Sequence, residues 1–420
     1  MSERIHATYL IETPYPLERA AEVMAGEQSS GTFTRLANET DELRANHGAS
    51  VERIEPLECV ETPSLPVRPT RGSDMPRYQR ARVTLSWPIA NLGPSLPNLL
   101  STLAGNLFEL KEFSALKLLD LTLPDSFAAA YPGPQFGIAG TRELTGIERR
   151  PLIGTIIKPS VGLTPAQTAE VVEQLVAGGI DFIKDDELQA NGPHNPLKAR
   201  VDAVMPIINA HAERTGRKVM YAFNITGDID EMRDHHDYVA AAGGSCVMVA
   251  VNSVGLAGVA HLRKHCRLAL HGHRAGWGMF SRSPHLGMSF VAYQKLWRLA
   301  GVDHIHVNGL ANKFSEADAS VIASARACLS PMFAPPAPGC EVMPVFSSGQ
   351  TARQAVETYQ ALGSTDLIFC AGGGIMAHPG GIASGVRSLR QAWDAAVQGE
   401  SLEVHAAEHR ELAEALETFR

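Results

Sequence analysis

The run Lys184-Asp185-Asp186-Glu187 places three acidic side chains next to a lysine. Such carboxylates repel one another, and are costly to bury, unless a cation joins them. Carboxylate oxygens suit Mg²⁺, which keeps some of its waters and lets substrate oxygens complete the coordination. The run therefore predicts a magnesium site, with a solvated acidic loop as the alternative.

Cationic residues also follow or end short apolar runs. Lys158 follows LIGTII, His273 and Arg274 follow LALH, and DHIH ends in His306. Lys313 stands a few residues farther on. The imidazoles and the guanidinium could bind an anionic group or polarise a carbonyl, although a single histidine is more often structural.

Two turns of small residues follow the last two apolar runs. They are Ser347-Ser348-Gly349 and Gly372-Gly373-Gly374. Glycine turns expose backbone N–H groups that bind phosphate, although a triple glycine is also common in plain turns. An anionic substrate would need such a local site, because 37 Lys and Arg against 45 Asp and Glu give a net charge of −8. That charge offers no general attraction for nucleic acid or anionic lipid.

These residues need a common scaffold, and the sequence from about residue 150 indicates one. Eight short apolar runs, which we interpret as strands, alternate with helix-period segments, the first of which begins with the capping box Thr164-Pro165-Ala166-Gln167. The runs are LIGTII, IDFI, KVMYAF, CVMVAV, LALH, DHIH, EVMPVF and DLIFC. Alternation predicts a parallel sheet, and eight units predict a closed (β/α)8 TIM barrel with its chemistry at the carboxyl ends of the strands. An open, doubly wound sheet is the alternative.

The first 130 residues show no such regularity and mix strand-like runs such as IHATYLIET with helix-like runs such as PLERAAEVMAG. We expect an N-terminal α+β domain at 1–130, a barrel domain at 131–420 and a proline-rich surface loop at 61–76. The 6 cysteines form no C-x-x-C pair and are expected to be buried reduced thiols. Because no run approaches about 18 apolar residues, the sequence predicts a cytoplasmic protein.

The motifs GTIIKPSVGL, GGIDFIKDDE, HGHRA, GVDHIH and the final glycine run resemble those of the large subunit of ribulose-bisphosphate carboxylase (RuBisCO) and its RuBisCO-like relatives of form IV type. The resemblance spans nearly the whole chain, including GEQSSGT and GNLF near the start. It implies that the N-terminal α+β domain is ferredoxin-like.

The resemblance also implies the metal ligands. Lys184 would be carbamylated by CO2 and would hold Mg²⁺ together with Asp186 and Glu187, whereas Asp185 would not be a ligand. Carbamylation requires the uncharged amine, so the lysine pKa of about 10.4 in water must be lowered by burial or by neighbouring groups.

Further roles follow from the same resemblance. Lys158 would be the acid/base group near the enolisable carbon, and Lys313 would neutralise a carboxylate at the reacting carbon. Substrate oxygens and the anionic end would be bound by His273, Arg274, His306 and Ser347, and the phosphate by Thr32, Gly349, Gly373 and Gly374. Glu27 and Asn106 would enter the site from the partner chain of a homodimer, alone or within a larger assembly of dimers with shared sites.

Four positions depart from the carboxylase pattern. Ser160 replaces a second lysine, Trp277 a loop histidine, Phe33 a tryptophan and Ser348 a glycine. The departures argue against carboxylation of ribulose bisphosphate and favour a RuBisCO-like protein.

The shared chemistry is formation of an enolate beside Mg²⁺ and a general base. A cation at the position of Lys313 is useful when a carboxyl group is released or transferred and is largely idle in simple proton transfer. We therefore predict decarboxylation, or carboxyl transfer and hydrolysis, of a phosphorylated 3-oxo sugar acid in carbohydrate catabolism. The alternatives are an enolase or isomerase acting on a methylthio-pentulose phosphate in methionine salvage, and a non-catalytic binding relative.

Overall fold

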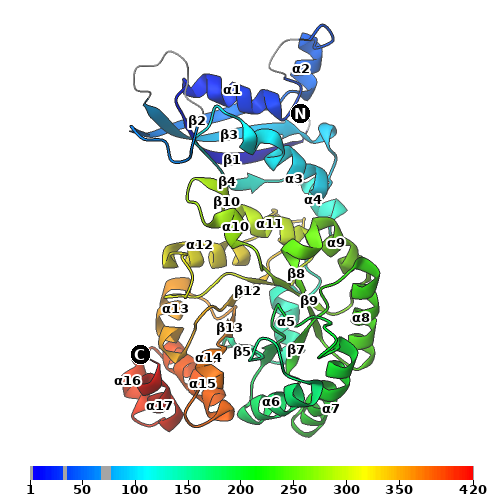
Figure 1. Ribbon diagram of the computed structural model, residues 1–420, viewed down its shortest axis with the longest axis vertical. Helices are drawn as coiled ribbons and strands as arrows, with labels where there is room; N and C mark the ends of the chain where they lie inside the picture. The colour runs from blue at the N-terminus through cyan, green and yellow to red at the C-terminus, as the bar shows by residue number, and fades with distance from the viewer. Residues whose placement is uncertain (1–2, 32–35, 68–76, 420) are drawn as a thin grey trace. The chain divides into compact units, whose positions relative to one another are not determined.

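The structure, a computed structural model, describes residues 3–31, 36–67 and 77–419. The chain forms two compact units (Figure 1). The first comprises Met1–Pro132, Gly276–Leu299 and Met332–Gly339, and the second comprises Gly133–Ala275, Ala300–Pro331 and Cys340–Arg420. Within the described ranges, no helix has the length and apolar character needed to cross a membrane.

The first unit contains a sheet of strand order β10-β4-β1-β3-β2. β1 pairs antiparallel with β3 and β4, β2 pairs antiparallel with β3, and β10 runs parallel to β4. Alternate side chains of β1 are buried. One of them, Tyr9, donates its hydroxyl proton to the carbonyl of Leu103 at 2.8 Å, so helix α3 (Leu96–Ala104) covers this face of the sheet. The strands are β1 (Arg4–Thr13), β2 (Ser50–Val60), β3 (Tyr78–Pro88), β4 (Ala115–Thr122) and β10 (Leu286–Met288). The helices are α1 (Leu17–Glu27), α2 (Asp41–His47), α3 (Leu96–Ala104), α4 (Asp125–Ala130), α10 (Gly278–Ser281) and α11 (Phe290–Ala300).

The second unit contains a closed barrel of eight parallel strands, as the sequence predicts (Figure 1). Its strands are β5 (Leu152–Ile156), β6 (Phe182–Lys184), β7 (Met220–Asn224), β8 (Cys246–Ala250), β9 (Ala269–His273), β11 (His304–His306), β12 (Met343–Phe346) and β13 (Ile368–Cys370). Each matches one of the eight apolar runs, which read as near-continuous apolar segments because barrel strands are buried on both faces. The open-sheet alternative is wrong.

Helices alternate with these strands and surround the barrel. They are α5 (Gly137–Thr145), α6 (Pro165–Gly178), α7 (Leu197–Thr215), α8 (Ile229–Ala241), α9 (Val251–His265), α12 (Asp318–Leu329), α13 (Ala355–Leu362), α14 (Gly373–Met376), α15 (Ile382–Gln398), α16 (Leu402–Ala406) and α17 (Arg410–Thr418). The predicted capping box at Thr164 is present and begins α6.

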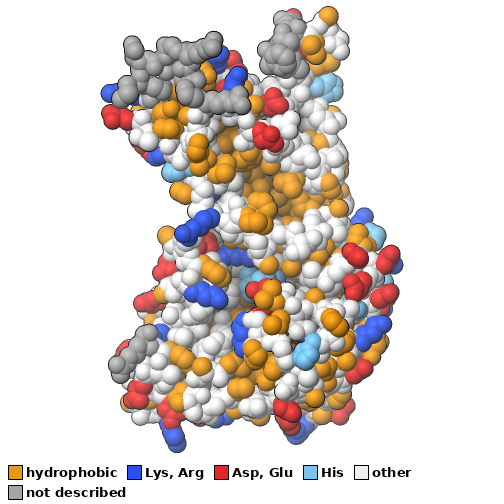
Figure 2. Space-filling view, viewed as in Figure 1, with side chains coloured by type: hydrophobic (Ala, Val, Ile, Leu, Met, Phe, Trp, Pro, Cys, Tyr) orange, Lys and Arg blue, Asp and Glu red, His pale blue; other side chains and the backbone are white. Residues whose placement is uncertain are grey.

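Side chains fill the barrel interior, where Phe182, Met220, Cys246, Met343 and Ile368 form one apolar cluster. The six cysteines are unpaired, and all except the exposed Cys59 are buried. On the face of the barrel unit drawn in Figure 2, acidic and basic side chains are interspersed rather than gathered into one basic area.

Candidate active site

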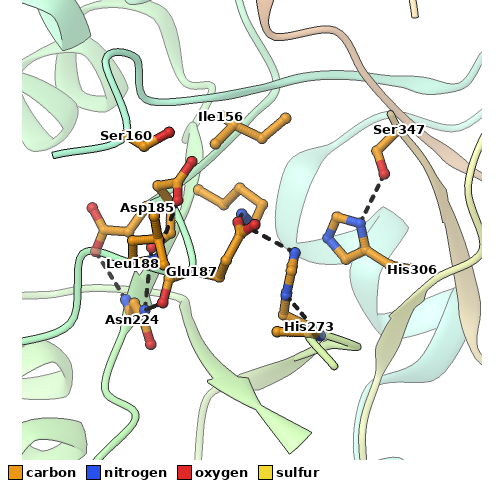
Figure 3. Close-up of polar contacts among 12 residues, drawn as sticks. Ile156, Ser160, Asp185, Glu187, Leu188, Asn224, His273, His306 and Ser347 are labelled. Atoms are coloured by element: carbon orange, nitrogen blue, oxygen red, sulfur yellow. Dashed lines mark hydrogen bonds and ion pairs between the residues drawn. The ribbon is translucent and has the colours of Figure 1, made fainter. Parts of the chain in front are cut away.

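The predicted site residues of the barrel unit lie at the carboxyl ends of its strands. Lys184, His273 and His306 are the last residues of β6, β9 and β11, and Lys158 follows β5 by two positions. Parallel strands in register end at the same rim of a barrel, which brings residues distant in sequence into one site. Figure 3 shows Asp185, Glu187, His273, His306 and Ser347 together at this rim.

Lys184 is fully buried, and its Nζ has no hydrogen-bond partner among the described residues. The nearest carboxylate oxygen recorded is Oε2 of Glu187, at 3.8 Å. Burial lowers the pKa of Lys184 against the opposing effects of Glu187 and Asp186. A larger fraction of this lysine is therefore an uncharged amine than for a lysine in water.

Asp185 and Asp186 have different surroundings. Asp185 accepts hydrogen bonds from the Tyr221 hydroxyl at 2.6 Å and the Asn224 amide at 2.9 Å, and it pairs with the buried Arg200. These bonds use both carboxylate oxygens of Asp185 and tie it to β7 and α7. Asp185 therefore holds these structural elements together, and its exclusion from the ligand set stays a prediction.

Asp186 contacts the predicted acid/base residue. Its Oδ2 accepts from Nζ of Lys158 at 2.6 Å, and Lys158 also donates to Ser160 at 2.8 Å. Burial alone would raise the pKa of Asp186, but hydrogen bonds from Lys158 and the Leu188 amide outweigh it and lower the pKa. Asp186 is therefore an anion at neutral pH. Ser160 and Asp186 thus accept from the same Nζ of Lys158.

Asn224, the last residue of β7, also belongs to the site. Its Nδ2 donates to the backbone carbonyls of Asp186 at 3.2 Å and Glu187 at 3.3 Å, which fixes the backbone of both acidic residues (Figure 3). Asn224 is not among the residues predicted from the sequence, although its position directly after the run KVMYAF marks it as a polar residue at a strand end.

His273 and Arg274 are neighbours in sequence but have different partners on the rim. Nδ1 of His273 accepts from the Ala275 amide at 3.2 Å, so its proton is on Nε2, which faces Oε2 of Glu187 at 3.4 Å (Figure 3). Burial and the nearby Lys184 hold the pKa of His273 well below its usual value. Arg274 is buried and pairs with Glu316 at 3.1 Å.

The two turns predicted to bind phosphate, at Ser347–Gly349 and Gly372–Gly374, differ in the space around their glycines. Gly349 has φ +89° and lies against Lys313, whose amide donates to the Ser348 carbonyl at 3.2 Å. A Cβ on Gly374 would lie 2.7 Å from the Gln350 carbonyl oxygen, whereas one on Gly373 would meet nothing within 4 Å. Glycine is thus needed at 374 for packing, and the exposed Gly373 leaves room for an anion.

Lys313 is exposed in the loop after β11, and its Nζ lies 5.2 Å from the ring centre of Phe314. The Nζ of Lys313 therefore lies at the surface of the protein and not in a buried ion pair.

The remaining predicted residues belong to the first unit. Glu27 ends α1, Asn106 begins a 3-10 turn (Asn106–Glu109), and both side chains are exposed. Gln28 connects these segments, since its side-chain oxygen, with the amide oriented to satisfy both bonds, accepts from the amides of Asn106 and Leu107. Thr32 and Phe33 lie outside the described residues. Trp277 is buried against Tyr293, with ring centres 4.3 Å apart.

The acidic rim fits a divalent cation. Asp186 and Glu187 offer carboxylate oxygens, and the unpartnered amine of Lys184 beside them fits an added carboxyl group that would supply a further oxygen.

Among the described residues, one set of three His, Cys, Asp or Glu side chains also lies close enough to share an ion, and it consists of His236, Asp237 and His265. It does not fit a metal. His236 donates through Nδ1 to Asp237 and accepts through Nε2 from the Arg267 amide, so neither nitrogen is available.

Family models for the two parts of the chain decide the assignment. Residues 3–127 match the ribulose bisphosphate carboxylase large chain N-terminal domain, and residues 137–419 match the catalytic domain of the same chain. The chain belongs to the RuBisCO large-chain family.

Several relatives within this family cover the whole chain. One is 60% identical over 420 residues, 100% of both chains, and is named 3-oxo-isoapionate-4-phosphate transcarboxylase/hydrolase, from Xanthobacter autotrophicus. Another, a 3-oxo-isoapionate-4-phosphate decarboxylase from Rhizobium etli, is 46% identical and covers 99% of this chain and 98% of its own.

Solved structures agree with this membership. A RuBisCO-like protein from Burkholderia fungorum has 51% identity and a TM-score of 0.92, covering 99% of this chain and 100% of its own. A dimeric archaeal RuBisCO from Hyperthermus butylicus has 32% identity and a TM-score of 0.84, covering 99% and 96%.

Proposed function

We propose that this RuBisCO-like protein is a Mg²⁺-dependent lyase-type enzyme that breaks the bond to the carboxyl group of a phosphorylated 3-oxo sugar acid, 3-oxo-isoapionate-4-phosphate. The observation that carries the proposal is the full-length identity of 60% with a transcarboxylase/hydrolase of that substrate. The geometry supports the proposal, because two lysine–carboxylate pairs lie on one rim of the barrel. The proposed acid/base residue Lys158 contacts Asp186, and the buried amine of Lys184 lies near Glu187.

Lys184, Asp186 and Glu187 would hold the magnesium ion. The neutral amine of Lys184 would add to CO2: the N–C bond would form as one C=O π bond opens, and one N–H proton would leave to solvent. This addition would convert an uncharged amine into an anionic oxygen ligand. When bound, Mg²⁺ supplies a Lewis acid that stabilises negative charge on the 3-oxo oxygen.

The protein's own residues then manage the proton and the anionic groups. When the bond between C1 and C2 breaks, its electron pair becomes the C2–C3 double bond of an enolate and the carboxyl carbon leaves as CO2. In decarboxylation the enolate is then protonated, whereas in carboxyl transfer a carbon of the enolate would attack the CO2 and water would afterwards cleave a C–C bond of the product. Lys158 is half-buried next to Asp186 and would deliver the proton that C2 needs. His273 and Ser347 would hold substrate oxygens, and the turns at Gly349 and Gly373 would hold the phosphate.

The fate of the carboxyl carbon separates the two reactions named for the relatives. We favour carboxyl transfer and hydrolysis over simple decarboxylation, because the transcarboxylase is the more similar of the two relatives. Substrate labelled with ¹³C in its carboxyl group should then place the label in a stable carboxylate product. Label in CO2 would instead identify a decarboxylase, and no consumption of the substrate, with Mg²⁺ and CO2 present, would overturn the proposal.

We also propose that two copies of the chain share each active site. Glu27 and Asn106 are exposed at neighbouring segments of the first unit, and a solved relative is a dimeric RuBisCO. A Glu27→Ala protein and a Lys158→Ala protein, each inactive alone, should therefore recover activity when mixed, because one site in a mixed dimer is intact. Activity and subunit exchange, followed with two tags, should be measured together. If activity does not recover although the subunits have exchanged completely, each active site lies within one chain.

A further inference from the structure

A series of hydrogen bonds runs across the ends of β11, β12 and β9, and its direction can be worked out. Glu316 accepts from Nδ2 of Asn308 at 2.6 Å, which fixes the orientation of the Asn308 amide. Its Oδ1 therefore faces Ser348 and accepts the Ser348 hydroxyl proton at 2.8 Å. Ser348 thus has no proton left for its neighbour Ser347.

Ser347 lies between Ser348 and His306. Its Oγ is 3.4 Å from Oγ of Ser348 and 3.0 Å from Nδ1 of His306 (Figure 3). Since the Ser348 proton is already used, any bond between the serines must use the proton of Ser347. If Ser347 uses its proton in this way, Nδ1 of His306 carries a proton and donates to Ser347. If Ser347 instead donates to Nδ1 of His306, the proton of His306 is on Nε2, and the surroundings of His271 distinguish the two arrangements.

His271 completes the series in the barrel interior. Its Nε2 lies 2.8 Å from Nε2 of His306, so one of the two nitrogens carries the shared proton. Burial holds the pKa of both imidazoles well below the usual value, and each ring is neutral with a single proton. A proton on Nδ1 of His306 therefore requires that His271 donate through Nε2, and the reverse also holds.

The unpartnered Nδ1 of His271 supports the same direction. It is buried and has no hydrogen-bond partner among the described residues. With the proton on Nε2, this Nδ1 is a bare acceptor, whereas the opposite tautomer would leave an unpaired buried N–H, which is rarer in proteins.

His304 provides a parallel in the same barrel. Thr141 donates its proton to the Gly137 carbonyl and must accept from Nε2 of His304 at 2.8 Å. The buried Nδ1 of His304, also without a partner in the described part of the chain, is therefore a bare acceptor as well.

From these contacts we infer that His271 is a positioning residue, which sets the tautomer of His306 so that the hydroxyl proton of Ser347 is free to bind an anionic oxygen of the substrate. Within the described part of the chain, the acceptor for that proton is Ser348 at 3.4 Å, and a phosphate or carboxylate oxygen is a better acceptor. The inference rests on the proposed function in assuming an anionic substrate at Ser347.

The tautomer can be tested without substrate. In protein labelled with ¹⁵N-histidine, the signals of His306, assigned by their loss in His306→Asn, should show a protonated Nδ1 and a bare Nε2. His271→Phe should remove this preference, and His271→Gln, whose amide N–H can replace the Nε2 donor, should restore it. A proton on Nε2 of His306 in the unaltered protein would overturn the inference.

Kinetics test the consequence. His271→Phe should raise KM for the phosphorylated substrate about tenfold, with a smaller change in kcat, because a hydrogen bond to an anion is weakened. The same change in a Ser347→Ala background should alter KM less than about twofold, since the hydroxyl it orients is absent. His304→Phe, an equal change in the same interior, should leave KM near that of the unaltered protein.

Equal effects of His271→Phe in both backgrounds would show a purely structural role and overturn the inference. Failure of the unaltered protein to consume the 3-oxo acid would overturn the proposed function, while the tautomer measurement would still decide the role of His271.

Discussion

Lys184→Met is expected to remove CO2-dependent Mg²⁺ binding and all metal-dependent turnover, and at the same time to make the metal-free protein more stable. The amine of Lys184 is fully buried without a hydrogen-bond partner in the described structure. Replacing an unsatisfied buried polar group with an apolar one of similar size can stabilise a fold by about 1–3 kcal/mol. Calorimetric Mg²⁺ titration with and without bicarbonate, and denaturant unfolding without metal, measure the two effects.

Lys158→Met is the matched control for this experiment. It removes the other lysine beside Asp186, so turnover should be lost while CO2-dependent Mg²⁺ binding remains. Equal Mg²⁺ affinity of the Lys184→Met protein in the presence and absence of CO2, at the level of the unaltered protein, would show that the carbamate is not part of the site.

Lys313→Met should abolish cleavage of the bond to the carboxyl group while sparing exchange of C–H protons with solvent. In the proposed reaction Lys313 lies over the carboxylate, and loss of one such charge-stabilising group costs about 10²–10³-fold in kcat. Proton exchange needs Lys158 and the metal but not this second cation. Consumption of the 3-oxo acid and deuterium incorporation into a phosphorylated ketose in D2O would report the two activities separately.

The chain offers a control in Lys198, an exposed lysine whose Nζ lies 5.3 Å from the ring centre of Tyr238, much as Lys313 lies over Phe314. Lys198→Met should leave both activities unchanged. Turnover of the 3-oxo acid by the Lys313→Met protein at the rate of the unaltered protein would contradict the cleavage mechanism and favour an isomerase.

The barrel could be predicted from sequence because its signals are local. Each strand is a short apolar run, and Thr164 with Gln167 marks the start of α6. The pairing of β10 with β4 could not be predicted, since three residues carry no recognisable pattern and their partner is distant in sequence. Helix α2, with no buried residue, has no apolar stripe to reveal it.

Part of the site could be predicted, because reactive residues that follow different barrel strands lie together at the carboxyl ends of those strands. The contact of Lys158 with Asp186 follows from this rule and the barrel topology. The roles of Asn224, Glu316 and His271 do not, because they depend on which of several nearby polar atoms is the donor. That choice is set by side-chain orientations, such as the Asn308 amide fixed by Glu316, which only the folded chain shows.

The placement of β10 in the first sheet has a consequence for synthesis of the chain. Five of the eight barrel strands precede β10 in sequence, yet β10 pairs with β4, and Lys295 beyond it binds Asp120 at 2.6 Å. While the ribosome is still making those five strands, the outer backbone groups of β4 have no strand to pair with. Such an open edge can pair with another nascent chain. The first unit therefore completes its sheet only after most of the second has been translated, and a fragment ending at residue 132 would keep the edge exposed permanently.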